Sequence, residues 1–208
     1  MHTPYNDSYK KYNILGFNTS EAEIIDLFKA WLAISIAFAI VMTRGHLTTS
    51  SFFLNLLAAL FTVGIGFMLH ELGHKAVAQK FGCFAEFRAN NQMLVLAIAV
   101  SFLGFIFAAP GAVVIAGKHI YGRRNGLISM AGPLMNIVLA LMFLAANLYM
   151  PNTIFRYGFM INIWIALFNM LPFSIIDGAK IYQWSKAVYL SMVIVILALI
   201  FAGGSSWA

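Results

Sequence analysis

The chain has 208 residues, of which 62% are hydrophobic and only 10% are charged, whereas an ordinary soluble domain has about 25% charged residues. Together with a mean hydropathy of +0.85, this composition excludes a water-soluble globular domain, a disordered chain and a disulfide-stabilised scaffold, for which the single cysteine Cys83 has no pair. The 13 lysines and arginines exceed the 7 acidic residues but form no long basic run, so we expect no nucleic acid among the partners and interpret the excess as a sign of membrane topology.

The first 27 residues are polar and lack the apolar stretch and small-residue cleavage site that mark a signal peptide. We interpret residues 1–27 as a polar N-terminal segment on the cytoplasmic side. A single membrane domain is expected over residues 28–203, followed by a short C-terminal tail at 204–208.

Six apolar segments follow, each close to the length of about 20 residues that a membrane-crossing helix needs. The connections between them are short and polar, so no loop can hold a separate soluble domain. The sequence therefore predicts an all-α polytopic membrane protein. The segments are Phe28–Thr43, Ser51–Met68, Met93–Gly117, Leu127–Tyr149, Tyr157–Ile176 and Ala187–Gly203.

The second apolar segment runs directly into the motif H-E-x-x-H, which starts at His70 and ends at His74. Residues four apart share one face of a helix, so both imidazoles can bind one Zn²⁺. Zinc lowers the pKa of a bound water to about 7. Glu71, next to the first histidine, is placed to act as the general base on that water.

A catalytic zinc site needs a third protein ligand and an open fourth position. The chain contains only three aspartates, Asp7, Asp26 and Asp177. The first two lie in the polar N-terminal region, whereas Asp177 closes the fifth apolar segment. Asp177 is therefore the candidate third ligand, with a solvated acid at a membrane boundary as the alternative.

The length of each segment limits how Asp177 can reach the histidines. A helix that rises about 1.5 Å per residue covers roughly 30 Å from Ser51 to His70. It covers the same length from Tyr157 to Asp177. Both motifs then lie at the far ends of their segments and share a metal only if those segments are parallel. Six straight crossings would make them antiparallel and separate the motifs by a membrane thickness.

A third segment that enters the bilayer and returns would bring the motifs level. Met93–Ala109 would go in as a helix, and Pro110–Lys118 would come back extended, at about 3.3 Å per residue. Pro110-Gly111 interrupts this segment, which a straight helix does not favour. The backbone of the returning part would have to be covered by protein or line a cavity.

The basic residues favour this re-entrant path, because lysine and arginine are enriched on the cytoplasmic side of membrane proteins. With it, eleven basic residues lie on one side and two, Arg44 and Arg156, on the other, whereas six straight crossings divide them seven against six. We predict a multi-pass protein of the cell membrane with its N-terminus and its metal end in the cytoplasm. The eleven are Lys10, Lys11, Lys29, Lys75, Lys80, Arg88, Lys118, Arg123, Arg124, Lys180 and Lys186.

Three motifs together resemble the site-2 proteases, a family of intramembrane zinc metalloproteases. They are H-E-L-G-H, then A-G-P-L-M-N at 131–136, which is similar to the family's A-G-P-x-x-N signature, and N-M-L-P-F-S-I-I-D-G-A-K at 169–180. The motifs stand in the family's order and span roughly Phe67 to Lys180. We identify residues 28–203 as the candidate protease domain.

The resemblance implies one zinc ion per chain, with His70, His74 and Asp177 as its ligands and Glu71 as the general base. It further implies that Asn169 faces the metal and steadies the substrate carbonyl or oxyanion. The implied activity is hydrolysis of a peptide bond within or near a transmembrane helix of a membrane-tethered protein, as in regulated intramembrane proteolysis. The expected partners are this substrate and the lipid bilayer, and the sequence carries no signal for an oligomeric state.

The segment Pro110, Gly111, Ala112 and Val113 lies where the family has an extended segment beside the substrate cleft. A helical peptide bond is shielded, so the substrate must unwind, and an edge strand could pair with its extended backbone. The alternative is a simple Pro-Gly break in a helical hairpin.

Two other functions stay open. A zinc carrier could use the same residues, although its path would need polar groups on several segments, and the fourth and sixth apolar segments carry no charged residue. A prenyl-peptide-type membrane metalloprotease would be expected to use glutamate as its third ligand. After the motif the chain offers only Glu86 for that role.

Overall fold

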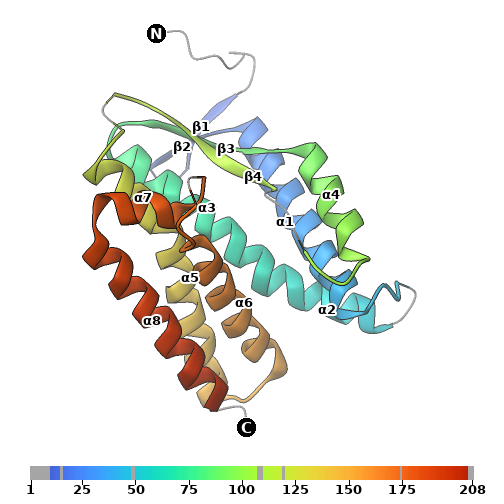
Figure 1. Cartoon of the computed structure of the whole chain (residues 1–208). Coiled ribbons are helices and arrows are strands. Elements are labelled where there is room, and N and C mark those ends of the chain that lie inside the picture. Colours follow the sequence, from blue (N-terminus) through green and yellow to red (C-terminus); the bar gives the residue numbers. More distant parts are fainter. Residues whose placement is uncertain are drawn as a thin grey trace.

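The computed structural model describes residues 10–14, 16–47, 50–106, 110–118, 120–173 and 175–205. Over these residues the chain is mostly helical, with two small antiparallel sheets (Figure 1). Predictions for residues 1–9, 107–109 and 206–208 lie outside the described residues. The elements are β1 (Lys11–Ile14), β2 (Phe17–Ser20), α1 (Glu21–Met42), α2 (Ser50–Ala59), the π-helical turn η1 (Leu60–Gly64), α3 (Ile65–Lys80), β3 (Phe84–Ala89), α4 (Asn91–Ser101), β4 (Gly111–Ala116), α5 (Arg123–Tyr149), α6 (Thr153–Asn169), α7 (Asp177–Trp184) and α8 (Lys186–Ser205).

Among the described residues, four helices are long and apolar enough to cross a membrane. The third and fifth predicted segments form the shorter helices α4 and α6. The structure thus confirms a mostly helical chain that is compatible with a multi-pass membrane protein, while the number of six crossing segments stays a prediction. The four long helices are Glu21–Met42, Ser50–Lys80, Arg123–Tyr149 and Lys186–Gly203.

The first helix, α1, begins at Glu21, before the first predicted apolar segment. The Ser20 side chain accepts a hydrogen bond from the backbone N–H of Glu23 at 3.3 Å, and the acids of the first turn favour a helix N-terminus. Strands β1 and β2 form a hairpin ahead of it. Over its described residues, the polar N-terminal segment therefore forms a hairpin and the first turns of α1.

One continuous helix, Ser50–Lys80, carries the H-E-x-x-H motif. The π-helical turn η1 interrupts its α-helical hydrogen bonding shortly before His70, and such turns are frequent near functional sites. The indole N–H of Trp31 donates to the carbonyl of Leu60 at 3.0 Å. The irregular turn is therefore held in place by the neighbouring helix α1.

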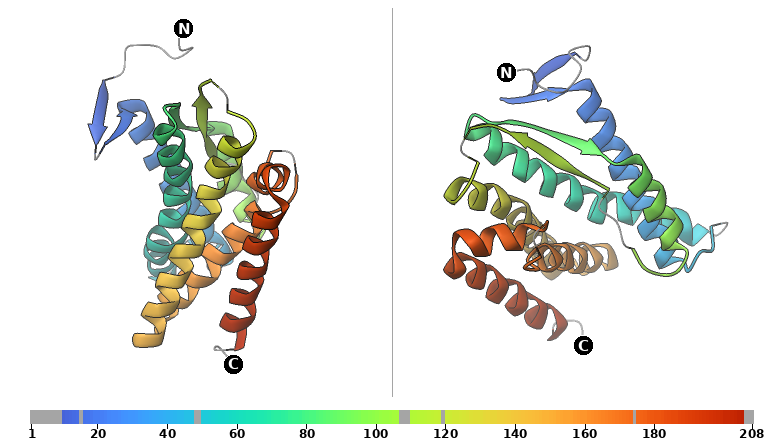
Figure 2. Two further views of the ribbon diagram at one scale, coloured as in Figure 1. Left: turned by 90° about the vertical axis from the view of Figure 1, so that its left-hand side faces the viewer. Right: turned by 45° about the horizontal axis from the view of Figure 1, so that its top comes forward.

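The stretch Lys80–Gln92, predicted as a polar connection, contains the strand β3. It pairs with β4 in an antiparallel sheet whose register places Phe87 opposite Val113. The two charges of the strand, Glu86 and Arg88, pair with each other, which is why a polar sequence can lie in a largely buried strand. The right-hand view of Figure 2 shows the β3–β4 sheet lying along α3.

The third predicted segment leaves the fold after Asn90 and comes back beside the same residue. The Asn90 side chain accepts a hydrogen bond from the backbone N–H of Met93 at 3.2 Å and caps α4. The helix ends at Ser101, well before the predicted Ala109, and β4 follows after the return. The backbone N–H of Asn90 donates to the Pro110 carbonyl at 2.9 Å, so the two ends of the excursion are adjacent. Its depth in a bilayer stays a prediction.

The fifth predicted segment is not helical to its end. α6 stops at Asn169, and Asp177 is the first residue of α7. Pro172 explains the break, because proline lacks a backbone N–H and forces the residue before it out of the helical region. The predicted helix from Tyr157 to Ile176 is therefore wrong over its last residues, and a turn brings Asp177 into place.

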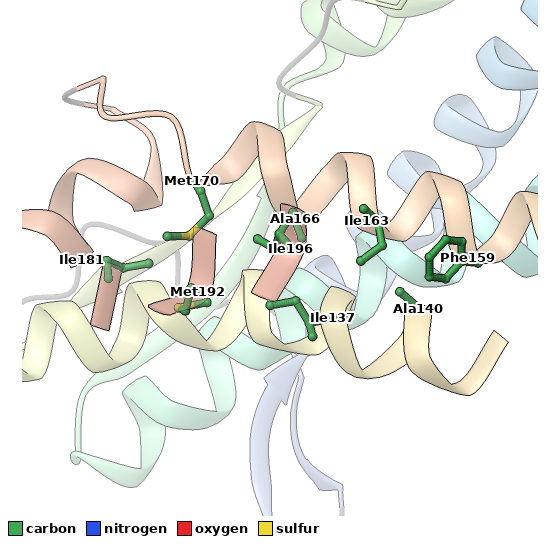
Figure 3. Packing of buried hydrophobic residues seen from close by; sticks show 9 residues of the cluster. All are labelled: Ile137, Ala140, Phe159, Ile163, Ala166, Met170, Ile181, Met192 and Ile196. Atoms are coloured by element: carbon green, nitrogen blue, oxygen red, sulfur yellow. The ribbon is translucent and has the colours of Figure 1, made fainter. Parts of the chain in front are cut away.

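The core of the C-terminal half anchors both ends of this turn. Met170, at the end of α6, and Ile181, on α7, belong to one cluster of buried residues. Figure 3 shows the cluster between α5, α6, α7 and α8. Its remaining members are Ile137, Ala140, Phe159, Ile163, Ala166, Met192 and Ile196.

Candidate metal centre

Three side chains that the sequence predicts as ligands meet in the interior of the protein. His70 and His74 lie one turn apart on α3, with their Nε2 atoms 3.1 Å apart. The Oδ2 atom of Asp177 lies 3.0 Å from Nε2 of His74 and 3.5 Å from Nε2 of His70. Among the described residues, this is the group of His, Cys, Asp and Glu side chains whose ligand atoms could hold a metal ion.

The spacing of these atoms fits a small tetrahedral cation. Ligand atoms about 2.0 Å from a tetrahedral centre lie about 3.3 Å from one another. The three observed separations, 3.0, 3.1 and 3.5 Å, bracket that value. Two imidazole nitrogens and one carboxylate oxygen are also the donor set of catalytic zinc sites, in which the fourth position stays open.

The outer nitrogen of each imidazole is already occupied by a partner on α5. Nδ1 of His70 lies 2.6 Å from Oδ1 of Asn136, and Nδ1 of His74 lies 2.8 Å from the carbonyl oxygen of Ile128. Both partners are acceptors, so each Nδ1 carries the proton and each Nε2 is free to bind a metal.

Gly132, on the same face of α5, makes room for the two Nε2 atoms. A Cβ at this position would lie 2.6 Å from Nε2 of His70 and would also collide with His74. Any larger residue would therefore occupy the space in front of the ligand atoms. The close approach of α5 to the two imidazoles depends on this glycine.

The contacts between α3 and α5 establish the direction of the helices. Gly66 of α3 accepts a hydrogen bond from Asn136, whereas His74, further along α3, contacts the earlier residue Ile128. The two helices are therefore antiparallel. Because the short turn 150–152 reverses the chain between α5 and α6, α6 runs parallel to α3. This is the relative direction that the sequence requires for a shared metal site.

Asp177 is held by contacts on both sides of the turn. A Cβ at the next residue, Gly178, would collide with the backbone of Met170, so the start of α7 packs directly on the end of α6. Oδ1 of Asp177 lies 3.5 Å from Nζ of Lys180. Burial alone would raise the pKa of Asp177, but the adjacent His70 and His74 lower it below its usual range, which favours the ionised carboxylate that a metal ligand needs.

Glu71 lies beside the strand that the sequence predicts to contact substrate. Its side chain is buried, and its Oε2 accepts a hydrogen bond from the backbone N–H of Val113 at 3.1 Å. The close approach of β3 and β4 depends on Gly111, where a Cβ would lie 2.5 Å from the ring of Phe87. Ala112 is exposed on β4, and Pro110 is buried just before it.

Asn169 is placed close to the turn but not on the three ligands. It is the last residue of α6, is half-buried, and donates from Nδ2 to the Ile165 carbonyl at 3.0 Å. Its neighbour Met170 contacts Gly178, next to Asp177. A role at the metal therefore requires that its amide exchange this local hydrogen bond for a substrate oxygen.

Known proteins with similar sequences are named as zinc metalloproteases. A protein of Methanocaldococcus jannaschii named "Putative zinc metalloprotease MJ0611" is 38% identical over 179 residues, which cover 83% of this chain and 90% of that protein. The chain belongs to the zinc metalloproteases. A second protein of the same organism, "Zinc metalloprotease MJ0392", is 27% identical over 153 residues, or 71% of this chain and 39% of that protein. No family profile and no solved structure matches the chain.

Zinc is accordingly the cofactor of this zinc metalloprotease, and the group of two histidines and one aspartate fits it. Glu86, the alternative third acid, is engaged elsewhere. It accepts a hydrogen bond from the Ser20 hydroxyl at 3.2 Å and pairs with Arg88. The donor set therefore favours Asp177, and not a glutamate as in the prenyl-peptide type.

The zinc metalloprotease has a chain of buried amides behind His70 that sequence reasoning missed. Nδ2 of Asn136 donates to Oδ1 of Asn162 at 3.0 Å and to the Gly66 carbonyl at 3.1 Å. Asn162 in turn donates to the Gly158 carbonyl at 2.8 Å. The available signal was a pair of amides inside apolar segments, where polar groups are costly and commonly have a function.

Replacing Asn136 by alanine should weaken zinc binding by about 10- to 100-fold, because His70 loses the acceptor that fixes its proton on Nδ1. Zinc affinity is measured by competition with a chelator in detergent. Asn147→Ala is the matched control, because Asn147 is another buried amide of α5, whose Oδ1 accepts the backbone N–H of Asn152 at 3.1 Å. Equal zinc affinities of both variants would contradict the role of Asn136.

Proposed function

We propose that this zinc metalloprotease is an intramembrane protease of the site-2 type, which hydrolyses a peptide bond within or near the transmembrane helix of a membrane-tethered protein. One observation carries the proposal. The two histidines of the candidate metal group lie on α3, in a helix long and apolar enough to cross a membrane, and the predicted general base Glu71 between them touches the strand β4.

In this proposal, His70, His74 and Asp177 hold the zinc ion. When bound, zinc supplies a Lewis acid that lowers the pKa of water and polarises the scissile carbonyl. Glu71 takes a proton from the attacking water and passes it to the leaving amine. Asn169 donates from its amide to the oxygen on which negative charge develops.

Strand β4 would receive the substrate along its outer edge. In an antiparallel pair, backbone N–H groups point alternately toward the partner strand and away from it. The Val113 N–H bonds to Glu71, so it points away from β3, and by alternation the N–H groups of Gly111 and Ile115 also point outward. An unwound substrate segment could add to this edge as a further strand, with main-chain hydrogen bonds.

The proposed placement in the membrane follows from the same arrangement. The excursion from Asn90 to Pro110 serves as the re-entrant segment, which makes α3 and α6 cross in the same direction. The distribution of basic residues favours a cell membrane protein whose N-terminus and metal end face the cytoplasm. A protein anchored in the same bilayer is the proposed substrate, since only such a chain reaches a site among membrane helices.

Zinc content and proteolysis of the same preparation test the proposal. The purified protein should contain about one zinc per chain and cleave a tagged single-helix membrane substrate, and a chelator should abolish cleavage until zinc is restored. Asp177→Ala should lower both zinc content and cleavage. Zinc that is bound tightly without Asp177 would overturn the proposed ligand set, and a zinc-loaded protein that leaves the membrane substrate intact would overturn the proposed activity.

A further inference from the structure

Glu23 is a fully buried acid that joins three elements of the fold. Its Oε2 accepts hydrogen bonds from the Thr19 hydroxyl of β2 and the Lys75 ammonium of α3, each at 2.5 Å. Its Oε1 accepts the backbone N–H of Phe87 of β3 at 3.0 Å. Lys75 is only 3% exposed, although the sequence places it among the basic residues predicted to lie at the membrane boundary.

A buried ion pair of this kind needs a reason other than stability. Desolvation of two charges typically offsets most of their attraction, and well-packed apolar residues often replace such a pair without loss of stability. What the pair supplies is a directional link between α3, which carries the predicted ligands, and β3. The best-attested use of buried charged or polar groups is to select one register or one arrangement.

This link holds one edge of the β3–β4 sheet, and a hydrogen bond to Glu71 holds the other edge. Phe87 and Val113 are opposite each other, and the N–H groups of both point out of the sheet, one to Glu23 and the other to Glu71. Lys75 and Glu71 are four residues apart on α3 and therefore share a face. The sheet is thus held at both edges, at a single cross-strand pair, by groups attached to the same helix face.

We propose that Glu23 and Lys75 are positioning residues that hold the β3–β4 sheet on α3 and so set which substrate peptide bond lies opposite Glu71. The proposal rests on the proposed function, in which substrate pairs with the outer edge of β4. A substrate carbonyl that takes the Val113 N–H removes its bond to Glu71. The Glu23–Lys75 pair then remains to keep the sheet from sliding along α3.

The double variant Glu23→Gln with Lys75→Met tests this role with the least damage to the fold. An amide at position 23 still accepts the Phe87 N–H, and methionine fills the space of the lysine stem without a charge, so no buried ion is left unpaired. The matched control is Asp26→Asn, because Asp26 also lies on α1 and accepts a β3 backbone N–H, that of Ala89 at 3.4 Å, while its ion-pair partner Lys29 lies on α1 and not on α3.

Four readouts are taken on zinc-loaded protein. The double variant should keep its zinc, exchange the backbone amides of β3 and β4 faster, and cut the tagged single-helix substrate at additional positions two residues from the main one. The step is two residues because the outward N–H groups of β4 repeat at that interval, so a sheet shifted along α3 places the next one opposite Glu71. Its kcat/KM should fall by about 10- to 100-fold. The Asp26→Asn protein should match the wild type in all four.

A double variant with one cleavage position and wild-type amide exchange would overturn the positioning role. So would loss of zinc, because the pair would then support the histidines and not the sheet. If the wild-type protein cleaves no membrane substrate, the proposed function fails, while amide exchange still decides whether the pair holds the sheet.

Discussion

Glu71→Gln is expected to lower the rate of proteolysis by about 100- to 10,000-fold while the zinc content stays at the wild-type level. Glu71 is not one of the three grouped ligand side chains. A glutamine amide oxygen can still accept the Val113 hydrogen bond, so the local structure should persist. What is lost is the ability to take a proton from water. Metal analysis and single-turnover cleavage of one preparation measure both quantities.

Glu21→Gln is the control for this change, because Glu21 is an exposed acid in the first turn of α1. It should cleave at the wild-type rate. The pair of variants also separates the protease from a zinc carrier, since a carrier has no need of a general base and would lose no function with Glu71→Gln. Full cleavage activity in that variant would refute the assigned role.

The candidate ligands could be predicted because their signals are local or nearly so. His70 and His74 follow from a four-residue spacing on one helix, which needs no tertiary information. Asp177 follows from the small number of aspartates and from the lengths of the apolar segments. The same length argument requires parallel helices, and α3 and α6 are parallel because each is antiparallel to α5.

The surroundings of the ligands could not be predicted because they depend on pairing across the chain. Lys75 was counted among the membrane-boundary charges, but it is buried because Glu23, far away in sequence, neutralises it. The polar sequence of β3 hid a strand because Glu86 and Arg88 pair with each other and because its partner strand β4 lies more than 20 residues further along the chain. The sequence does show the cause of the helix end at Asn169, which is Pro172. The predicted helix was nevertheless too long because the apolar pattern continues past this proline.

Gly132 makes room for the Nε2 atoms of the two histidines, so its replacement has a specific expected effect. Gly132→Ala should weaken zinc binding by more than about 100-fold. In a helix interior, alanine is favoured over glycine by about 1 kcal/mol, so the helix itself should not suffer. The added Cβ would instead lie 2.6 Å from Nε2 of His70. The imidazole of His70 cannot move away without breaking the contact between its Nδ1 and Asn136 or moving its Nε2 out of the ligand geometry.

Gly158→Ala separates this effect from a general loss of packing. A Cβ at Gly158 would lie 2.6 Å from the ring of Phe143, a clash of the same size between α5 and α6. We expect this variant to unfold at a lower temperature but to bind zinc normally while folded, whereas Gly132→Ala should stay folded and lose zinc. Thermal unfolding with and without a chelator measures both effects. If both variants lost zinc in proportion to stability, Gly132 would be a packing residue only, because the metal site would then respond to the helix interface as a whole.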